Sequence, residues 1–155
     1  MGNRLLFAAA VLLLLRCSAV LATGTGALVT LSPDEQTVKQ GTPPRFVVQI
    51  EAASGPLRVL KFGARDDLKH AYARVMLTRS GSPVEVPRVI SDPGPTSDSD
   101  YVDLRPGQKM TFVHDGMPLV LSRLPPGDYS ARVKVWPDWR SDPVLSNRVA
   151  FRVVQ

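Results

Sequence analysis

The chain has 155 residues, including 14 prolines, 11 glycines and one cysteine, and its formal charge is +5. This length suits one domain and excludes a second hydrophobic core of ordinary size. Hydrophobic residues make up 44% of the chain, which excludes wholesale disorder. The proline and glycine content favours short strands joined by turns over a bundle of helices.

The N-terminal segment has the three regions of a secretory signal peptide. Arg4 supplies the positive charge, residues 5–15 are unbroken apolar sequence, and small residues up to Ala22 suit signal peptidase. We expect residues 1–22 to be removed, with cleavage after Ala19 as the alternative site, so that the protein is secreted or periplasmic. The alternative interpretations are an N-terminal anchor helix that is not removed and a lipoprotein attached through Cys17. The anchor helix is less expected than a cleaved signal peptide, because the apolar stretch is short for a membrane span.

The expected mature chain, residues 23–155, is a single domain. Loss of Arg4 and Arg16 leaves 17 basic against 14 acidic residues, a formal charge of +3. That charge gives solubility with little steering, so nucleic acid is not an expected partner. Cys17 is lost as well, which excludes disulfides and cysteine metal sites. No later apolar stretch reaches the length of a membrane span, so we expect none in the mature chain.

Turn signals separate short runs in which apolar and polar residues alternate. Within 45–52, for example, Phe46, Val48 and Ile50 share one face. Such runs, punctuated roughly every 8 to 12 residues, predict an all-β fold, an antiparallel β-sandwich of immunoglobulin or fibronectin type. The expected strands are 27–31, 45–52, 57–62, 72–79, 84–90, 101–104, 109–114, 128–136 and 147–154, with a hairpin turn at 78–83, a helical turn or two within 64–73 and a loop at 91–100.

The most specific local motif is the run from Leu124 to Tyr129. Leu124, Gly127 and Tyr129 fit the pattern Leu-x-Pro-Gly-x-Tyr, which is typical of a tyrosine corner in immunoglobulin-like and fibronectin-like sandwiches. In a tyrosine corner the tyrosine hydroxyl forms a hydrogen bond with a backbone group a few residues earlier in the chain. This bond stabilises the connection that crosses between the two sheets. We predict this structural role for Tyr129, because the segment supplies no base that would activate it as a nucleophile.

The sequence lacks the motifs of the common enzyme classes. It has no Gly-x-Ser-x-Gly elbow, Walker loop, dinucleotide-binding glycine motif or His-Glu-x-x-His motif. The two histidines, His70 and His114, lie in unrelated segments without metal-ligand spacing, and we expect His114 to be exposed at a turn. We therefore predict a non-enzymatic protein without a cofactor, and we assign no residue to a metal site.

An acidic cluster precedes and enters the strand expected at 101–104. Asp98, Asp100 and Asp103 could converge on calcium, which takes oxygen ligands. The cluster lacks the invariant glycine and terminal glutamate of an EF-hand, and a solvated acidic loop is the commoner arrangement. The sequence leaves calcium binding open.

Two loops are the expected contact surface. Trp136 and Trp139 flank a turn, where paired indoles could stack on sugar rings or anchor a partner protein, although one of them could instead cap the core. The loop 91–100, with Pro93 and Pro95, and the loop 136–143 are expected at one end of the sandwich. The leading prediction is a secreted accessory domain that binds a protein through these loops. The alternatives are a proteinase inhibitor presenting the 91–100 loop and a carbohydrate-binding module using Trp136 and Trp139.

The order of motifs between Phe46 and Val154 resembles a known domain. It comprises Pro56-Leu-Arg-Val-Leu-Lys61, Arg79-Ser-Gly81, Asp100-Tyr-Val-Asp-Leu-Arg-Pro-Gly107 and Leu124-Pro-Pro-Gly-Asp-Tyr129. This is similar to the β-sandwich domain that precedes the catalytic domain of secreted deuterolysin-like zinc endopeptidases, and similar layouts occur in intracellular proteinase inhibitors of the small bacterial sandwich type. In those peptidases activity lies in a following domain with a His-Glu-x-x-His motif. This chain lacks that motif, so the resemblance implies a free-standing accessory sandwich and no peptidase residue is carried over.

Overall fold

The structure is a computed structural model that describes residues 26–87, 92–115 and 121–155. Strands make up 48% of these residues and helices only 9%, which confirms the all-β prediction. The predicted signal peptide, residues 1–22, lies outside the described residues, as does the end of the predicted strand 84–90. Within the described ranges, no helix is long and apolar enough to cross a membrane.

The first sheet is antiparallel and has three strands in the order β1-β3-β8. These are β1 (Ala27–Pro33), β3 (Phe46–Ala52) and β8 (Lys109–His114). Every second side chain of β3 is buried, from Phe46 to Ala52, as the alternating sequence predicts. The face made by these alternate residues is one wall of the core.

The second sheet is larger and mixed, with the order β2-β11-β9-β5-β6. It comprises β2 (Thr37–Lys39), β11 (Val149–Val154), β9 (Gly127–Val135), β5 (Ala73–Arg79) and β6 (Ser82–Val84), and β10 (Val144–Leu145) also pairs with β9. The purely antiparallel prediction is wrong at one edge, where β2 runs parallel to β11. The chain passes from the first sheet to the second within residues 34–36, and β2 pairs the backbone groups that β11 would otherwise leave at a bare edge.

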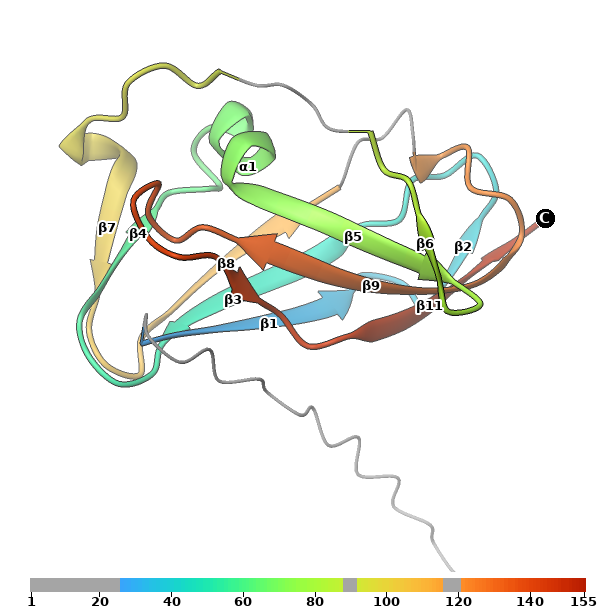
Figure 1. Cartoon of the computed structure of the whole chain (residues 1–155), viewed down its shortest axis with the longest axis horizontal. Coiled ribbons are helices and arrows are strands. Elements are labelled where there is room, and N and C mark those ends of the chain that lie inside the picture. Colours follow the sequence, from blue (N-terminus) through green and yellow to red (C-terminus); the bar gives the residue numbers. More distant parts are fainter. Residues whose placement is uncertain (1–25, 88–91, 116–120) are drawn as a thin grey trace, which may run out of the picture.

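The two sheets face each other and share one core. Figure 1 shows β5, β9 and β11 lying over β1, β3 and β8. The buried apolar side chains of both sheets form a single cluster. Across the layers, the rings of Phe46 and Phe151 meet edge to face with centroids 5.5 Å apart. The hydrophobic faces predicted from alternation therefore pack against each other, as a layered β domain requires.

A third, two-stranded sheet lies at one end of the molecule (Figure 1). It pairs β4 (Leu57–Leu60) with β7 (Tyr101–Leu104), and a 3₁₀ turn, η1 (Asp98–Asp100), leads into β7. The helix α1 (Asp66–Tyr72) falls within the predicted 64–73 and buries Leu68 against the core. These elements bring the segments around residues 58, 100 and 138 to the same end.

Two predicted strand boundaries are wrong for local reasons. The expected strand 84–90 gives way to β6, which ends at Val84, and residues 85–87 are not in a strand. Proline at 83 and 87 has no backbone N–H to donate to a ladder, which limits this strand to a short edge. The expected strand 147–154 begins at Val149 instead, as β11; before it, Leu145 of β10 lies opposite Lys134 while Val149 lies opposite Ala131. Three residues, 146–148, thus face two residues of β9, which is a β-bulge.

The predicted hairpin at 78–83 is present and tight. Arg79 pairs with Ser82, so Ser80 and Gly81 alone make the turn, with φ of 49° and 83°. Two consecutive positive φ values give the turn type whose twist matches antiparallel strands.

Candidate functional site

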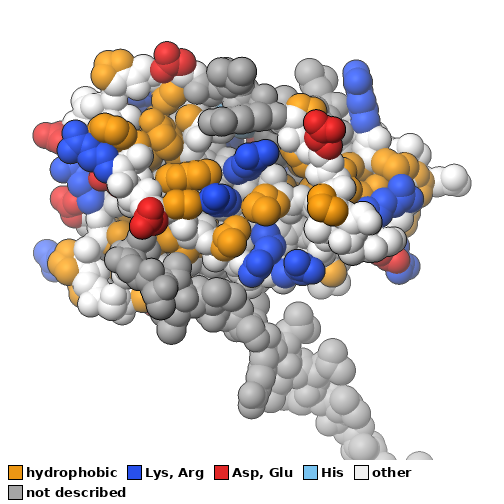
Figure 2. All heavy atoms as spheres, viewed as in Figure 1, with side chains coloured by type: hydrophobic (Ala, Val, Ile, Leu, Met, Phe, Trp, Pro, Cys, Tyr) orange, Lys and Arg blue, Asp and Glu red, His pale blue; other side chains and the backbone are white. Residues whose placement is uncertain are grey.

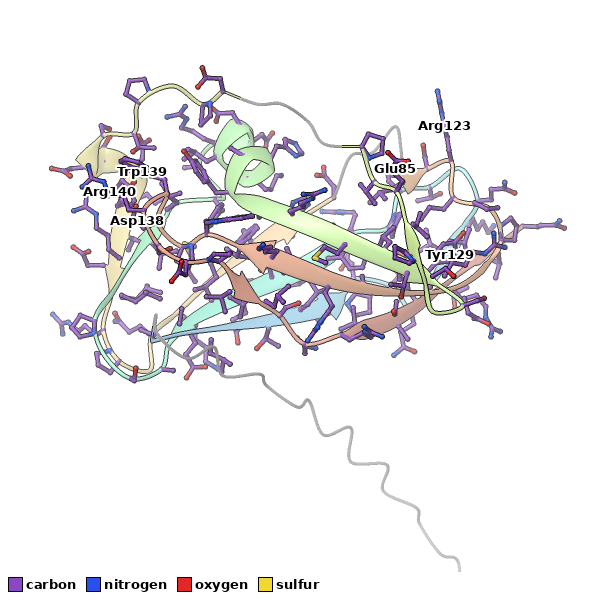
Figure 3. All side chains as sticks on the ribbon, viewed as in Figure 1. Glu85, Arg123, Tyr129, Asp138, Trp139 and Arg140 are labelled. Atoms are coloured by element: carbon purple, nitrogen blue, oxygen red, sulfur yellow. The ribbon has the colours of Figure 1, made fainter. Side chains whose placement is uncertain are left out.

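A pocket of about 240 Å³ lies at the end of the molecule that carries β4 and β7. Figure 3 shows Asp138, Trp139 and Arg140 together at this end, on the loop that follows β9. The opposite wall comes from β4, η1 and the start of β7. We call this feature the end pocket; its lining residues are Arg58, Thr96, Ser97, Asp98, Tyr101, Asp138, Trp139 and Arg140.

The Trp139 wall presents an exposed aromatic ring on a constrained loop. Trp139 is 49% exposed, and the guanidinium carbon of Arg140 lies 4.5 Å from its ring centroid, a cation–π contact. Asp138 holds the turn: its carboxylate accepts the Arg140 N–H at 3.2 Å, and its carbonyl accepts the Ser141 hydroxyl at 2.8 Å. Side-chain bonds of aspartate to nearby backbone stabilise such turns, so the indole is presented by a loop with a defined shape.

Tyr101 and Arg58 form the facing wall. The Arg58 guanidinium carbon lies 4.3 Å from the Tyr101 ring centroid, and Arg58 Nη2 pairs with Asp98 Oδ1 at 2.5 Å. The Tyr101 hydroxyl lies 3.1 Å from Thr96 Oγ1 and donates at 3.5 Å to Asp138 Oδ1. Tyr101 therefore connects the two loops that line the end pocket.

The segment before β7 is held by a capping arrangement. The Ser97 N–H donates to Asp100 Oδ2 at 2.8 Å, and this bond is the main reason that the pKa of Asp100 lies below its usual range. Arg65, which precedes α1, adds a contact to Asp100 at 3.4 Å and donates at 2.7 Å to the Pro93 carbonyl. The 92–100 segment is thus tied both to itself and to the start of the helix.

The acidic cluster is spread among different partners. Asp98 pairs with Arg58, Asp100 bonds Ser97 and Arg65, and Asp103 is exposed on β7. Among the described residues, no group of three histidine, cysteine, aspartate or glutamate side chains is placed to hold a metal ion.

The predicted contact residues do not all reach the end pocket. Trp139 lines it, whereas Trp136 lies outside the lining, with its ring centroid 5.1 Å from the Lys134 ammonium. Pro93 and Pro95 are also outside the lining; Pro93 is half-buried under Arg65 and Pro95 is exposed. The loop that contains them contributes its later residues, Thr96 to Asp98, instead.

Sequence reasoning missed Arg58, Tyr101 and Arg140. Arg58 is the exposed residue of strand β4. Its outward direction could be predicted from the apolar residues on either side of it, but its contact partners could not. Its contacts with Asp98 and Tyr101 depend on the pairing of β4 with β7, in which Arg58 lies opposite Asp103.

The Leu124–Tyr129 motif has the geometry of a structural element. Tyr129 is 3% exposed and its hydroxyl donates to the Pro125 carbonyl at 2.7 Å. Arg79 donates to the Pro126 carbonyl at 2.7 Å, with its guanidinium carbon 5.6 Å from the Tyr129 ring centroid. Gly127 has φ +156°, and a Cβ there would lie 2.9 Å from Arg79 Nε. With Leu124 also buried, this motif joins the start of β9 to the end of β5.

The prediction of an exposed His114 is wrong. Its side chain is 3% exposed, and Nε2 lies 2.9 Å from the Ala73 carbonyl oxygen, to which it donates as the neutral tautomer. Alternation from Phe112 places it on the inner face of β8, a signal that outweighs its nearness to a turn. The rings of His70 and His114 meet edge to face with centroids 5.9 Å apart. Burial lowers the pKa of His114 to about 4, so the ring is neutral at pH 7.

Two sequence comparisons, with family models and with curated proteins, give no match.

Proposed function

We propose that this chain is an exported, non-enzymatic binding domain with an immunoglobulin-like β-sandwich architecture, and that it contacts a partner protein through the end pocket. The observation that supports this most is the meeting of the two loops around a half-exposed indole, Trp139, which is stacked with Arg140. Two facing β layers and the buried Tyr129 hydroxyl bond favour the immunoglobulin-like architecture. The signal-peptide pattern of residues 1–22 favours export.

The size and chemistry of the end pocket favour a protein partner. A volume of about 240 Å³ accommodates one partner side chain and is below the usual range for sites that enclose a whole small molecule. Tryptophan and arginine are the residue types most enriched among energetically dominant interface residues. Because Asp138 and Tyr101 already hold both loops, little conformational entropy is lost when a partner docks.

The test uses Trp139 as the altered residue and Val113 as its control. Val113 is a similarly exposed apolar residue, 37% exposed, on the three-stranded sheet. Immobilised wild type, Trp139→Ala and Val113→Ala are used to capture proteins from the exported fraction of the source cells. We expect a protein that wild type and Val113→Ala retain and that Trp139→Ala retains at least about ten-fold less. Equal capture by all three proteins contradicts the proposal.

Fluorescence then locates the contact. The chain has two tryptophans, so Trp136→Phe leaves Trp139 as the only indole and as a reporter of the end pocket. Addition of the captured protein should shift the emission of the Trp136→Phe variant. An unchanged emission at saturating partner places the contact elsewhere and contradicts the proposed site.

Carbohydrate binding is the second candidate, favoured by one specific observation. The exposed face of Trp139 lies beside Thr96, Tyr101 and Asp138, whose oxygens could bond sugar hydroxyls while the ring stacks on the pyranose. The same Trp136→Phe variant is titrated with a panel of soluble glycans. Two results together would favour carbohydrate over protein as the ligand. The first is a saturable change in emission that Arg140→Ala weakens, and the second is that no protein is captured.

A further inference from the structure

The outward face of the larger sheet carries four cations in neighbouring positions. In the pairing of β5 with β9, Arg74 lies opposite Lys134 and Met76 lies opposite Arg132. Arg148 is exposed immediately before β11, on the same side as the exposed Ala150. Directly opposite residues on antiparallel strands have Cβ atoms about 5 Å apart, and successive outward residues of a strand are about 7 Å apart. We call this surface the basic face: Arg74, Met76, Arg132, Lys134, Trp136, Leu145 and Arg148.

The positive charge of the basic face is not neutralised by carboxylates. On the outward positions of β5, β9, β10 and β11 that the structure describes, the one acidic residue is Asp128, and its Oδ1 accepts from Arg152 Nε at 2.6 Å. Within the described ranges, none of the four cations forms an ion pair. Figure 2 views this face and shows Lys and Arg side chains gathered over its centre, with hydrophobic side chains between them.

Apolar side chains are interleaved with the cations. Met76 is 44% exposed in the middle of the face. Trp136 and Leu145 are half-buried beside Lys134, which lies opposite Leu145 and whose ammonium is 5.1 Å from the indole centroid. Arg132 and Lys134 are themselves half-buried, and Arg132 Nε donates to the Ser146 carbonyl at 3.1 Å, which holds that side chain against the sheet. Arginine, methionine and tryptophan are the residue types that protein–protein interfaces favour over the rest of the surface.

We propose that the basic face binds an acidic, partly apolar surface of another protein, separately from the end pocket. Charge complementarity requires carboxylates opposite the four cations, and a polypeptide can place them at the spacing of the sheet. It can also bury Met76 and Leu145 under apolar side chains. A phosphodiester or sulfated-sugar backbone would satisfy the cations but leave these aliphatic side chains uncovered, which is the reason for choosing protein over other polyanions.

The test uses full-length chain carrying Trp139→Phe, so that Trp136 alone reports on the basic face. The probes are a random copolymer of glutamate and tyrosine, poly-L-glutamate, duplex DNA and heparin, each titrated at about physiological ionic strength. The altered protein is Arg74→Glu/Lys134→Glu. The control, Arg105→Glu/Arg123→Glu, changes the net charge equally at two exposed positions outside this face; Figure 3 shows Arg123 directed away from it.

We expect the copolymer to bind more tightly than poly-L-glutamate, and Arg74→Glu/Lys134→Glu to weaken its binding at least about ten-fold while the control changes it by less than about two-fold. Met76→Ser should remove the preference for the copolymer over poly-L-glutamate. Two adjacent glutamates could destabilise the sheet, so a second variant, Arg74→Gln/Lys134→Gln, is tested after its fold has been checked by circular dichroism. It should also weaken binding of the copolymer, by a smaller factor.

Two results overturn the proposal. Equal weakening by the face variant and the control would mean that net charge alone drives binding. Tighter binding of DNA or heparin than of the copolymer, lost in the face variant, would assign the surface to a different class of polyanion. Both results are read from the fluorescence of Trp136. They therefore do not bear on the proposed function of the end pocket, which is tested through Trp139.

Discussion

Several polar side chains among the described residues are buried in the core and end on backbone hydrogen-bond partners; Asn147, His114 and Tyr129 are three of them. Asn147 Oδ1 accepts the Leu31 N–H at 2.7 Å and its Nδ2 donates to the Leu31 carbonyl at 3.0 Å. His114 Nε2 donates to Ala73, and the Tyr129 hydroxyl donates to Pro125. Such groups stabilise a fold only while paired, because a buried donor or acceptor without a partner costs more than an average hydrogen bond contributes. Substitution of these residues therefore changes the free energy of unfolding by leaving buried polar groups unpaired, an effect separate from any loss of apolar packing.

His114 makes stability dependent on pH. Burial favours the neutral ring and lowers its pKa to about 4, below the ordinary value of 6.5. The stabilisation by the neutral ring is complete above about pH 6.5 and is lost as the pH falls toward 4, which amounts to about 3 kcal/mol at most. Urea unfolding at a series of pH values measures it. His114→Gln can keep the bond to Ala73 without titrating there, and its unfolding free energy should vary less over this range; His70→Gln, which keeps His114, should retain the slope. An unchanged slope in His114→Gln refutes the assignment.

Asn147 ties the two layers together by covering an edge. β1 is an edge strand of its sheet, and both backbone groups of Leu31 on the free side are bonded by Asn147. We expect Asn147→Ala to lower the free energy of unfolding by about 2–4 kcal/mol, because it leaves a buried N–H and a buried carbonyl unpaired. Arg148→Ala, at the exposed neighbouring residue, should change it by less than about 0.5 kcal/mol. Equal effects of the two substitutions in chemical denaturation would show that Asn147 has no such role.

At the scale of elements, alternation determines which side of a strand is buried, and turns and bulges determine where that alternation is interrupted. The β-bulge at 146–148 turns Asn147 inward although Arg148 is exposed. The Ser80-Gly81 turn reverses the chain within two residues because both adopt positive φ.

Gly81 is expected to tolerate a side chain sterically but not conformationally. A Cβ at this position meets no atom within 4 Å, and φ is +83°. Gly81→Ala should therefore destabilise the protein by about 1–2 kcal/mol through backbone strain alone. Gly63→Ala is the matched control, since its Cβ also meets open space and its φ is not in the left-handed region; it should be neutral or slightly stabilising. Similar losses at both glycines in thermal unfolding would rule out strain as the cause.

At the scale of the whole molecule, one core supports two separate surfaces. The end pocket is made by loops and the small β4–β7 sheet, whereas the basic face is the outer side of the larger sheet. Trp139 belongs to the first and Trp136 to the second. Both surfaces depend on the same cluster of buried side chains between the layers.

Phe46 tests whether that core unfolds as a unit. It is fully buried on β3 and contacts Phe151 across the layers. Phe46→Ala should cost about 3–5 kcal/mol, the usual range for such truncations. Measured by fluorescence in Trp136→Phe and Trp139→Phe backgrounds, the loss should be the same for both reporters, because a single domain of this size unfolds cooperatively. Different losses at the two indoles would show that the end pocket and the basic face unfold independently.

The sequence by itself determined the β class, the strands near 45–52, 101–104 and 109–114, and the hairpin turn. Each of these follows from neighbours along the chain: alternation selects a buried face, and proline and glycine mark the turns. The inward position of His114 was readable from the same alternation, and nearness to a turn was the wrong guide to it.

Only the tertiary structure decided which segments meet. The parallel position of β2, the bond from Asn147 to Leu31, the separation of the two tryptophans and the approach of Trp139 to the Tyr101 wall all depend on strand order and register between distant segments. Tyr101 and Asp138 are 37 positions apart, and nothing local to either one specifies the other. The physical reason is that alternation fixes the side of a strand that a residue occupies, whereas its neighbours across the sheet are chosen by the packing of the entire core.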